Sequence, residues 1–152
     1  TNIAQMVNVL QAMILTDEEK MLLTPTYHVF KMYVPFQDAQ LIPISFEAGT
    51  YKFGDISLQQ VDAIAARGKD GKIWLAMANL DANRPAEIAI NVPGVAANAA
   101  IGEVLSAKRF DAINTFDAPD AVVPKAISVR STDGKLVLPL PPHSVAVVRL
   151  EP

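Results

Sequence analysis

The two histidines of this 152-residue sequence are the side chains best suited to proton transfer near neutral pH, and each lacks the neighbours that catalysis needs. His143 precedes Ser144, but a nucleophilic triad needs a base that reaches the hydroxyl and a carboxylate that orients the base. Because adjacent residues on a strand point to opposite faces, we interpret this pair as the beginning of a strand after Pro141-Pro142. His28 has Met32 at i+4 in place of a second ligand, so we predict a packed or capping histidine and no metal site.

Clustered carboxylates and one tryptophan are the other candidates for chemistry. A glycosidase needs two carboxyl groups held a fixed distance apart across a sugar, whereas Asp17-Glu18-Glu19 are sequence neighbours in a polar stretch. We expect them to form a solvated loop, because catalytic carboxyls need burial. Trp74 could stack on a sugar, but its apolar surroundings favour a place in the core. Gly68 and Gly71 are assigned to a hairpin rather than to a phosphate-binding loop. The residues by themselves therefore predict no catalytic group.

Composition limits the class of protein. The 13 Lys and Arg against 16 Asp and Glu give a net charge of -3, which argues against a nucleic-acid groove or a patch for anionic membranes. With 51% hydrophobic residues the chain can bury a core, and with no Cys it has no disulfide or thiolate zinc site. No apolar run approaches the roughly 20 residues of a membrane span. We therefore expect one folded domain with no nucleic-acid or membrane partner.

Helical spacing characterises the first 36 residues. Positions i, i+3, i+4, i+7 and i+11 are apolar and correspond to Ile3, Met6, Val7, Leu10 and Ile14. This spacing predicts a helix over 3–14, followed by a polar break at 16–20. Thr24-Pro25 is typical of an N-cap with proline at the first helical position, which predicts a helix over 25–33 that ends before Pro35.

From about residue 39 the period of hydrophobicity is two. Large aliphatic residues occupy every second position over 87–92 and 135–140, which predicts strands with one buried face. The run 73–78 is apolar on both faces, which predicts a central strand. Turn signals are Asp70-Gly71, 81–85, Pro93-Gly94 and Asp133-Gly134, and we expect a long irregular excursion at 110–124. Short strands separated by turns, without helices between them, predict an antiparallel sandwich.

Four blocks in order along the chain resemble α-L-arabinofuranosidases of glycoside hydrolase family 51. They read NIAQMVNVL with ILT after it, TPTYHVFKMY, NTFDAP with VVP after it, and PPHSV. The resemblance implies a mainly β fold. Residues 37–152 would form a jelly-roll-like antiparallel β-sandwich, and residues 1–36 would be a short helical segment from the end of a (β/α)8 barrel. That segment would contain the end of the last strand, a loop and the last helix of the catalytic barrel.

The implied activity is that of a retaining exo-glycosidase that releases terminal arabinofuranose from arabinoxylan, arabinan or arabino-oligosaccharides, without a cofactor. Its two glutamates, an acid/base and a nucleophile, would lie on earlier barrel strands, and neither has a counterpart in this sequence. The resemblance therefore implies that these 152 residues alone are inactive.

Gln5 is the one substrate-binding residue that the resemblance implies. It matches the family glutamine near the end of the eighth barrel strand, and a primary amide offers donors and an acceptor to sugar hydroxyls. Asn8, in the same loop, is a weaker candidate for shaping the pocket. Because this match places Gln5 at the end of a strand, we retain the predicted helical turn only for 6–14.

The implied partners are the catalytic barrel of the same polypeptide, an arabinose-containing saccharide and further copies in a homo-oligomer. The resemblance favours the cytoplasm, with the periplasm and secretion as alternatives. A non-catalytic carbohydrate-binding or structural accessory β-sandwich is the alternative. Aromatic residues are 7% of the sequence, and because isolated aromatics in strands usually pack inward, a supporting role is favoured over sugar capture.

Overall fold

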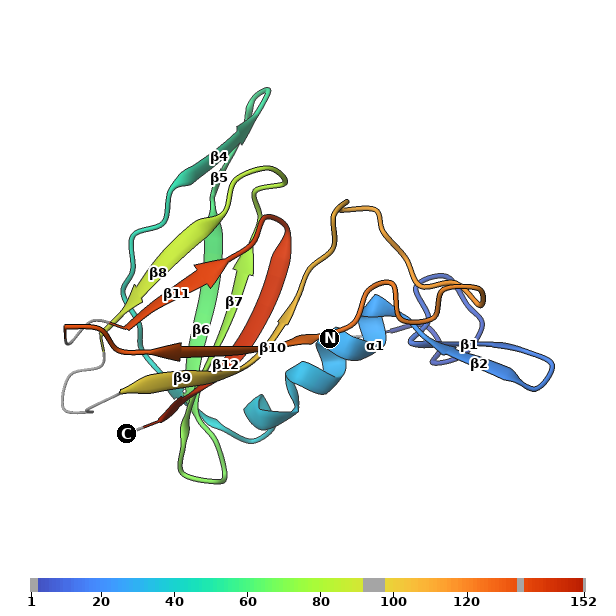
Figure 1. The fold of residues 1–152 in the computed structure, drawn as a ribbon, viewed down its shortest axis with the longest axis horizontal. Coiled ribbons are helices and arrows are strands. Elements are labelled where there is room, and N and C mark those ends of the chain that lie inside the picture. The colour runs from blue at the N-terminus through green and yellow to red at the C-terminus, as the bar shows by residue number, and fades with distance from the viewer. Residues whose placement is uncertain (1–2, 92–97, 134–135, 152) are drawn as a thin grey trace.

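A computed structural model describes residues 3–91, 98–133 and 136–151. A hairpin and one α-helix precede a body made of antiparallel strands (Figure 1). In chain order the described elements are β1 (Ile14–Asp17), β2 (Lys20–Leu23), α1 (Pro25–Met32), the 3-10 turn η1 (Val34–Phe36), β3 (Gln40–Ile42), β4 (Thr50–Phe53), β5 (Ile56–Gln59), β6 (Val61–Arg67), β7 (Ile73–Asn79), β8 (Ala86–Ile90), β9 (Ala99–Leu105), β10 (Lys125–Arg130), β11 (Leu136–Leu140) and β12 (Ser144–Glu151). The expected mainly β, antiparallel fold is confirmed.

The largest sheet has the strand order β10-β9-β12-β7-β6-β3. β7 lies between β12 and β6, so the predicted central strand is confirmed. Its alternate residues enter two different cores, because Leu75 and Met77 join one buried cluster and Ala76 joins another. A sheet covered on both faces explains why this strand is apolar throughout.

A two-stranded sheet of β8 and β11 covers one face of the large sheet. Leu136, Leu138 and Leu140 are almost fully buried against the large sheet, with Leu138 at 0% exposure. The residues between them, Val137 and Pro139, are exposed. The alternation predicted for this strand is therefore confirmed, and the two layers form the sandwich (Figure 1).

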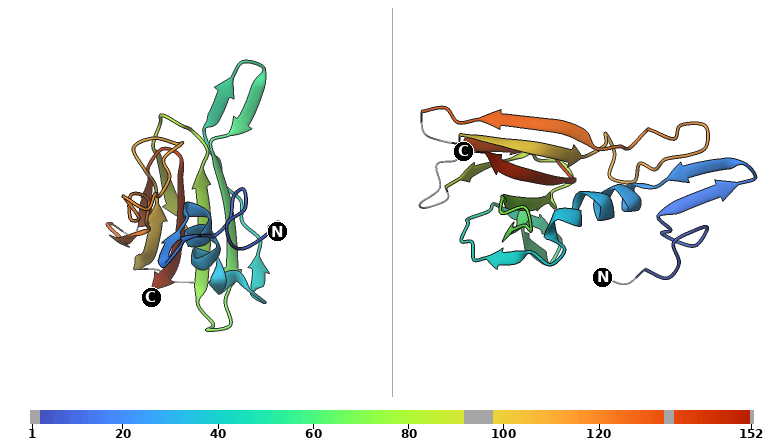
Figure 2. Two further views of the ribbon diagram at one scale, coloured as in Figure 1. Left: turned by 90° about the vertical axis from the view of Figure 1, so that its right-hand side faces the viewer. Right: turned by 90° about the horizontal axis from the view of Figure 1, so that it is seen from below.

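Helix α1 covers part of the opposite face of the large sheet, as both views in Figure 2 indicate. The Thr24 hydroxyl accepts a hydrogen bond from the Tyr27 amide at 3.4 Å, and Pro25 occupies the first turn, which confirms the predicted start of this helix. Met32, buried at the other end, packs with Val147 of β12. The helix is thus part of the core that the sandwich strands build.

The helical turn predicted for 6–14 is wrong. Val7 instead forms an isolated parallel bridge to Ile14, and Asn8 and Gln11 have positive φ values of 55° and 60°, which a right-handed helix excludes. The segment is a loop that leads into the β1–β2 hairpin, and the polar break of 16–20 lies around the tip of that hairpin. Because Leu10 is 86% exposed, the helical spacing marks no buried face in the described part of the chain.

Most of the predicted turns lie where the sequence places them. Asp70-Gly71 lies in the connection of the β6–β7 hairpin, where Gly71 has a φ of +76°. The segment 81–85 is a turn between β7 and β8, and 110–124 is the expected irregular excursion between β9 and β10. Pro93-Gly94 and Gly134 lie outside the described residues.

Candidate functional site

His143 precedes β12, Ser144 begins it, and the two side chains bind different partners. The ring nitrogens of His143 lie 3.0 Å from the Ala82 carbonyl oxygen and 2.7 Å from that of Ala107. The Ser144 hydroxyl donates instead to the Pro141 carbonyl at 2.7 Å. His143 therefore joins two loops, and the structural interpretation of this pair is confirmed.

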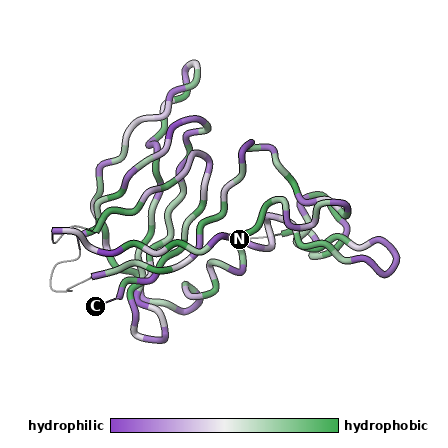
Figure 3. Tube along the Cα trace, viewed as in Figure 1, coloured by the Kyte–Doolittle hydropathy of each residue, from purple (hydrophilic) through white to green (hydrophobic). Residues whose placement is uncertain are grey.

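The acidic cluster Asp17-Glu18-Glu19 lies at the exposed tip of the β1–β2 hairpin. Figure 3 shows this tip as a hydrophilic end of the molecule. Catalytic carboxyls need a water-excluded setting, and these side chains are fully solvated. The predicted solvated loop is confirmed.

Asp81 is the carboxylate most enclosed by protein, with its side chain 3% exposed. Its Oδ1 accepts hydrogen bonds from the Asn83 and Arg84 amides, each at 2.9 Å, and its Oδ2 accepts from Arg84 Nε at 2.6 Å. The Asn83 amide, aided by Arg84, holds the pKa of Asp81 below its usual value despite burial. Both of its oxygens accept hydrogen bonds within one turn, so we assign Asp81 a structural role.

We expect Asp81→Asn to weaken the dependence of the free energy of unfolding on pH below pH 7. A carboxyl whose pKa is lowered by folding contributes stability above its unfolded pKa, about 3.9, and loses that contribution as the pH falls through the folded pKa. The parent protein should therefore lose more free energy of unfolding between pH 7 and pH 3 than the variant loses. Urea unfolding across this range measures the difference, with the exposed Asp55→Asn as control. Parallel profiles for Asp81→Asn and the parent protein would contradict this assignment.

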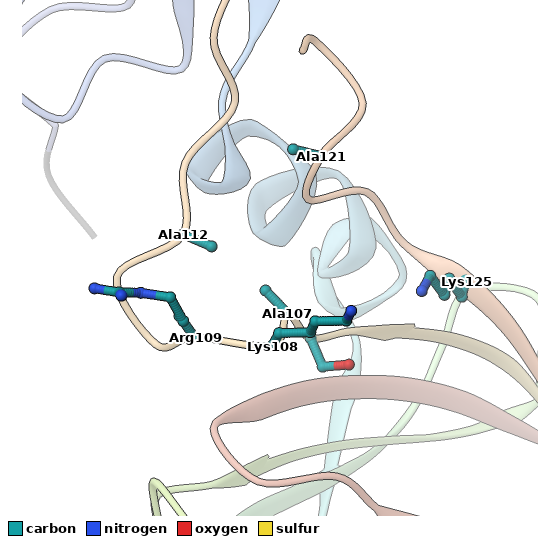
Figure 4. Close-up of a pocket in the computed structure, with 7 residues that line it drawn as sticks. Ala107, Lys108, Arg109, Ala112, Ala121 and Lys125 are labelled. Carbon is teal, nitrogen blue, oxygen red and sulfur yellow. The ribbon is translucent and has the colours of Figure 1, made fainter.

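An open cavity of about 500 Å³ lies beside the loop that follows β9. Figure 4 shows its lining, which is basic or small: Ser106, Ala107, Lys108, Arg109, Ala112, Ala121 and Lys125. Arg109 donates two hydrogen bonds to Asp111, at 2.8 and 2.6 Å. No carboxylate belongs to the lining, so this cavity does not offer the acid pair of a glycosidase.

A second cavity, of about 420 Å³, lies between the two sheets near Pro85, Ile127 and Pro139. It is mainly apolar and contains one carboxylate, that of Glu87. Glycoside hydrolysis needs a pair of such groups, so this cavity also lacks the required chemistry.

Trp74 is half-buried and packs against the cluster beneath α1, at the border of the core and not inside it as predicted. Its indole N–H lies 3.3 Å from both carboxylate oxygens of Asp70. The Arg149 guanidinium lies 5.8 Å from the ring centroid, in a cation–π contact. Ring face and ring nitrogen are thus already engaged by protein groups, which disfavours sugar stacking.

His28 lies on α1, half-buried, with its ring edge-on to that of Tyr27 at a centroid distance of 5.5 Å. Burial, followed by the charge of Lys31, lowers the pKa of His28. Within the described ranges, no three His, Asp or Glu side chains gather in a way that could hold a metal ion. The interpretation of His28 as a packed residue is confirmed.

Gln5 lies on the surface, in the loop before β1. The loop is fixed just after it, because the Asn8 amide donates to the Thr16 hydroxyl at 2.8 Å and accepts from the Thr16 backbone at 2.7 Å. At its far end the Thr24 hydroxyl donates to the Ala12 carbonyl at 2.8 Å. Asn8, considered above for shaping a pocket, thus holds the loop together, and Gln5 extends from an anchored backbone.

Asn114 is a structural residue that local sequence patterns do not reveal. It is 4% exposed, and its amide donates to the carbonyls of Leu23 at 2.9 Å and Val122 at 3.0 Å. Its oxygen accepts from the Val122 amide at 2.7 Å. One side chain thereby joins the excursion after β9 to the end of β2. The only hint in the sequence is its place in the NTFDAP block.

Within the described residues no helix is long and apolar enough to cross a bilayer. Neither of the two cavities described above is lined by a pair of carboxyl groups. Gln5, exposed on its fixed loop, remains the site residue to be tested.

Comparisons with known proteins agree with one another. The family described as the alpha-L-arabinofuranosidase C-terminal domain matches residues 1–144. An intracellular exo-alpha-L-arabinofuranosidase of Bacteroides ovatus is 41% identical over 152 residues, which are 99% of this chain and 30% of that relative. This chain therefore spans less than a third of the length of the curated relative.

Solved structures lead to the same group of proteins. The GH51 arabinofuranosidase from Xanthomonas axonopodis pv. citri superimposes with a TM-score of 0.93 at 43% identity, over 99% of this chain and 31% of that one. The thermostable GH51 alpha-L-arabinofuranosidase from Thermotoga petrophila superimposes with a TM-score of 0.81 at 25% identity, over 97% of this chain and 33% of that one. The resemblance found in the sequence is confirmed.

Proposed function

Because the chain belongs to the α-L-arabinofuranosidase C-terminal domain family, we propose that it forms the C-terminal part of a retaining exo-α-L-arabinofuranosidase. The whole enzyme releases terminal arabinofuranose from arabinoxylan, arabinan or arabino-oligosaccharides. In this proposal the sandwich supports the catalytic part and does not itself bind the polysaccharide.

The observation that carries this proposal is the near-complete match to enzymes that are about three times as long. Identity of 41% and 43% extends over 99% of the chain, yet the chain covers only 30% and 31% of those relatives. Neither of the two cavities described above is lined by a pair of carboxyl groups. In this proposal the acid/base and nucleophile of a retaining mechanism belong to the polypeptide outside these residues.

We assign residues 1–36 to the end of a (β/α)8 catalytic barrel and residues 37–152 to the β-sandwich. Apolar side chains of the first segment are available for contact with the barrel, because Met6 is 58%, Met21 64% and Val34 52% exposed. Exposed apolar residues can belong to a surface that another part of the protein covers. The barrel would cover them.

Gln5 is the residue of this chain that we assign to the sugar. It is exposed and lies close to the loop that Asn8 anchors, so its amide can face a neighbouring pocket without loss of backbone order. A primary amide both donates to and accepts from vicinal hydroxyls, which suits the ring of a terminal arabinofuranose. Its role is recognition, with the chemistry left to the two glutamates.

The same relationship supports a proposal for the cell compartment and the assembly. The curated relative from Bacteroides ovatus is described as intracellular, and we propose a cytoplasmic enzyme that acts on imported arabino-oligosaccharides. We also propose a homo-oligomer, in agreement with the family resemblance.

Expression of the complete gene tests the proposal. The full-length protein is expected to release arabinose from a nitrophenyl arabinofuranoside and from arabinoxylan, and residues 1–152 alone are expected to release none. Calorimetric titration of the same fragment with arabino-oligosaccharides is the matched control, and we expect no saturable binding. An inactive full-length protein, or tight sugar binding by the fragment, would favour a carbohydrate-binding accessory domain instead.

A further inference from the structure

The hairpin of β4 and β5 projects from the sandwich as a free two-stranded ribbon (Figures 1 and 2). Its register places Tyr51 opposite Leu58 and Phe53 opposite Ile56. Because side chains alternate along a strand and directly opposed residues share a face, these four residues form one face of the ribbon. We name them the apolar ribbon face.

The other face of the ribbon is entirely polar. It consists of the opposed pairs Thr50 with Gln59 and Lys52 with Ser57. One apolar and one polar face are the pattern of a sheet that is covered on one side and solvated on the other. The sequence of this hairpin therefore predicts that its apolar face is covered and that its polar face is solvated.

No such cover is present among the described residues. Phe53 is 72% exposed, Ile56 55% and Leu58 48%, while Tyr51 is half-buried. An isolated two-stranded hairpin is marginally stable in water, so a solvated ribbon of this kind gains most from packing on another surface. The apolar ribbon face is thus an exposed surface suited to packing against another part of a protein.

The base of the ribbon is held in place before docking. The Gln60 amide donates to the Gly49 carbonyl, and Gln60 Nε2 donates to the carbonyls of Arg84 and Pro85, at 3.3 and 3.1 Å. Arg84 in turn donates to the Thr50 carbonyl at 2.8 Å. Since Asp81 binds Arg84, the ribbon is tied to the buried polar turn between β7 and β8. A fixed base lowers the entropy cost of docking.

The size of the apolar ribbon face argues against a second copy as its main occupant. Four partly exposed side chains offer on the order of 400 Å². A stable dimer usually buries about 800 Å² on each partner. A contact of half that size suffices when the two surfaces belong to one polypeptide, because tethering raises their effective concentration.

The length of the relatives favours the polypeptide that precedes residue 1 in them. In the left view of Figure 2 the ribbon extends from the top of the molecule, and the N-terminal loop lies lower, at its side. The homologues are about three times as long as this chain, so the additional polypeptide is large enough to reach both. We infer that the apolar ribbon face docks on the catalytic part of the same polypeptide, as a contact separate from residues 1–36. This inference rests on the proposed function.

Site-directed photo-cross-linking in the full-length enzyme tests this assignment. A benzophenone amino acid is introduced at Phe53 on the apolar ribbon face and, in a matched control, at Lys52 on the polar face of the same strand. The protein is prepared as an equal mixture of unlabelled and ¹⁵N-labelled chains. After irradiation, mass spectrometry identifies the linked peptides and shows whether each pair carries one isotope or both.

The expected result is a single-isotope link from position 53 to a peptide upstream of residue 1, with a yield several-fold higher than from position 52. Mixed-isotope pairs would assign the face to a second copy, and equal yields from the two positions would leave it in solvent. Either outcome overturns the inference. Arabinose release by the same preparation is measured in parallel, so an inactive enzyme with the expected link would contradict the proposed function alone.

Discussion

Replacement of Gln5 by alanine in the full-length enzyme is expected to lower kcat/KM by roughly 30- to 1000-fold, or about 2–4 kcal/mol. The loss is this large because hydrogen bonds to the sugar strengthen as charge develops in the transition state. Gln5 is exposed in the structure, so the change should leave the melting temperature nearly unaltered. Steady-state kinetics with a nitrophenyl arabinofuranoside provide the measurement.

The matched control is Gln37→Ala, which removes another exposed glutamine distant in sequence from the loop. We expect this variant to retain the kinetic constants of the parent enzyme. If the kcat/KM of Gln5→Ala corresponds to a loss of transition-state stabilisation of less than about 0.5 kcal/mol, Gln5 does not contact the sugar in the transition state. A large fall in melting temperature would instead assign it to the stability of the loop.

Leu138→Ala is expected to reduce the free energy of unfolding of the sandwich by about 3–5 kcal/mol. Leu138 has no exposed surface and lies on β11 between the two layers, within the cluster that includes Leu75 and Val148. Truncation removes three carbon atoms from a region in which rigid strands on both sides limit collapse, so a cavity remains. Hydrogen–deuterium exchange of peptides from β6 to β12, followed through a guanidinium titration, reports on this part of the full-length protein.

The neighbouring residue provides the control, because Val137 lies on the same strand but on its outer face, 37% exposed. Val137→Ala should lower the free energy of unfolding by less than about 1 kcal/mol. Similar losses in the two variants would contradict the assignment of β11 to a layer with one buried and one solvated face.

The sandwich strands could be predicted because alternate residues of a strand face opposite sides of the sheet. Leu136, Leu138 and Leu140 occupy every second position in the sequence, and in the structure they are buried while the residues between them are exposed. The continuous apolar run of β7 predicts a strand covered on both faces, and the structure supplies one cluster on each side of it. In both cases the pattern results directly from the layers between which the strand lies.

The segment 6–14 could not be predicted in this way. Spacings of three and four also occur in irregular chain, and the left-handed backbone at Asn8 and Gln11 has no signal in hydrophobic periodicity. Asn is one of the residue types that tolerate this conformation, and the Asn8 side chain is held by two hydrogen bonds to Thr16, eight positions away. Met6, Val7 and Leu10 are exposed in the described chain, so their spacing carries no information about a core.

The polar residues that organise the site region depend on distant partners. Asn114 binds the Leu23 carbonyl, 91 positions away, and the partners of His143 lie 61 and 36 positions away. The secondary-structure propensity of neighbouring residues does not predict hydrogen bonds between residues so far apart in the sequence. Thr24 was predicted as a helix cap, and its additional bond to the Ala12 carbonyl is visible only once β2 and the preceding loop are folded. Gln5 was found through family resemblance, since an exposed amide has no distinctive pattern of its own.

The packing of helix α1 has a consequence for the engineering of hybrid enzymes. Along the chain this helix belongs with residues 1–36, but Met32 and Val29 pack with Val147 of the sandwich, and Asn114 bonds the end of β2. A recombination junction placed after Phe36 would separate the sheet from the helix that shields it and leave Val147 in water. A donor segment that begins before β1 transfers the sandwich together with the hairpin and helix α1 that cover it. Only the surface that is already exposed in this structure then has to fit the foreign barrel.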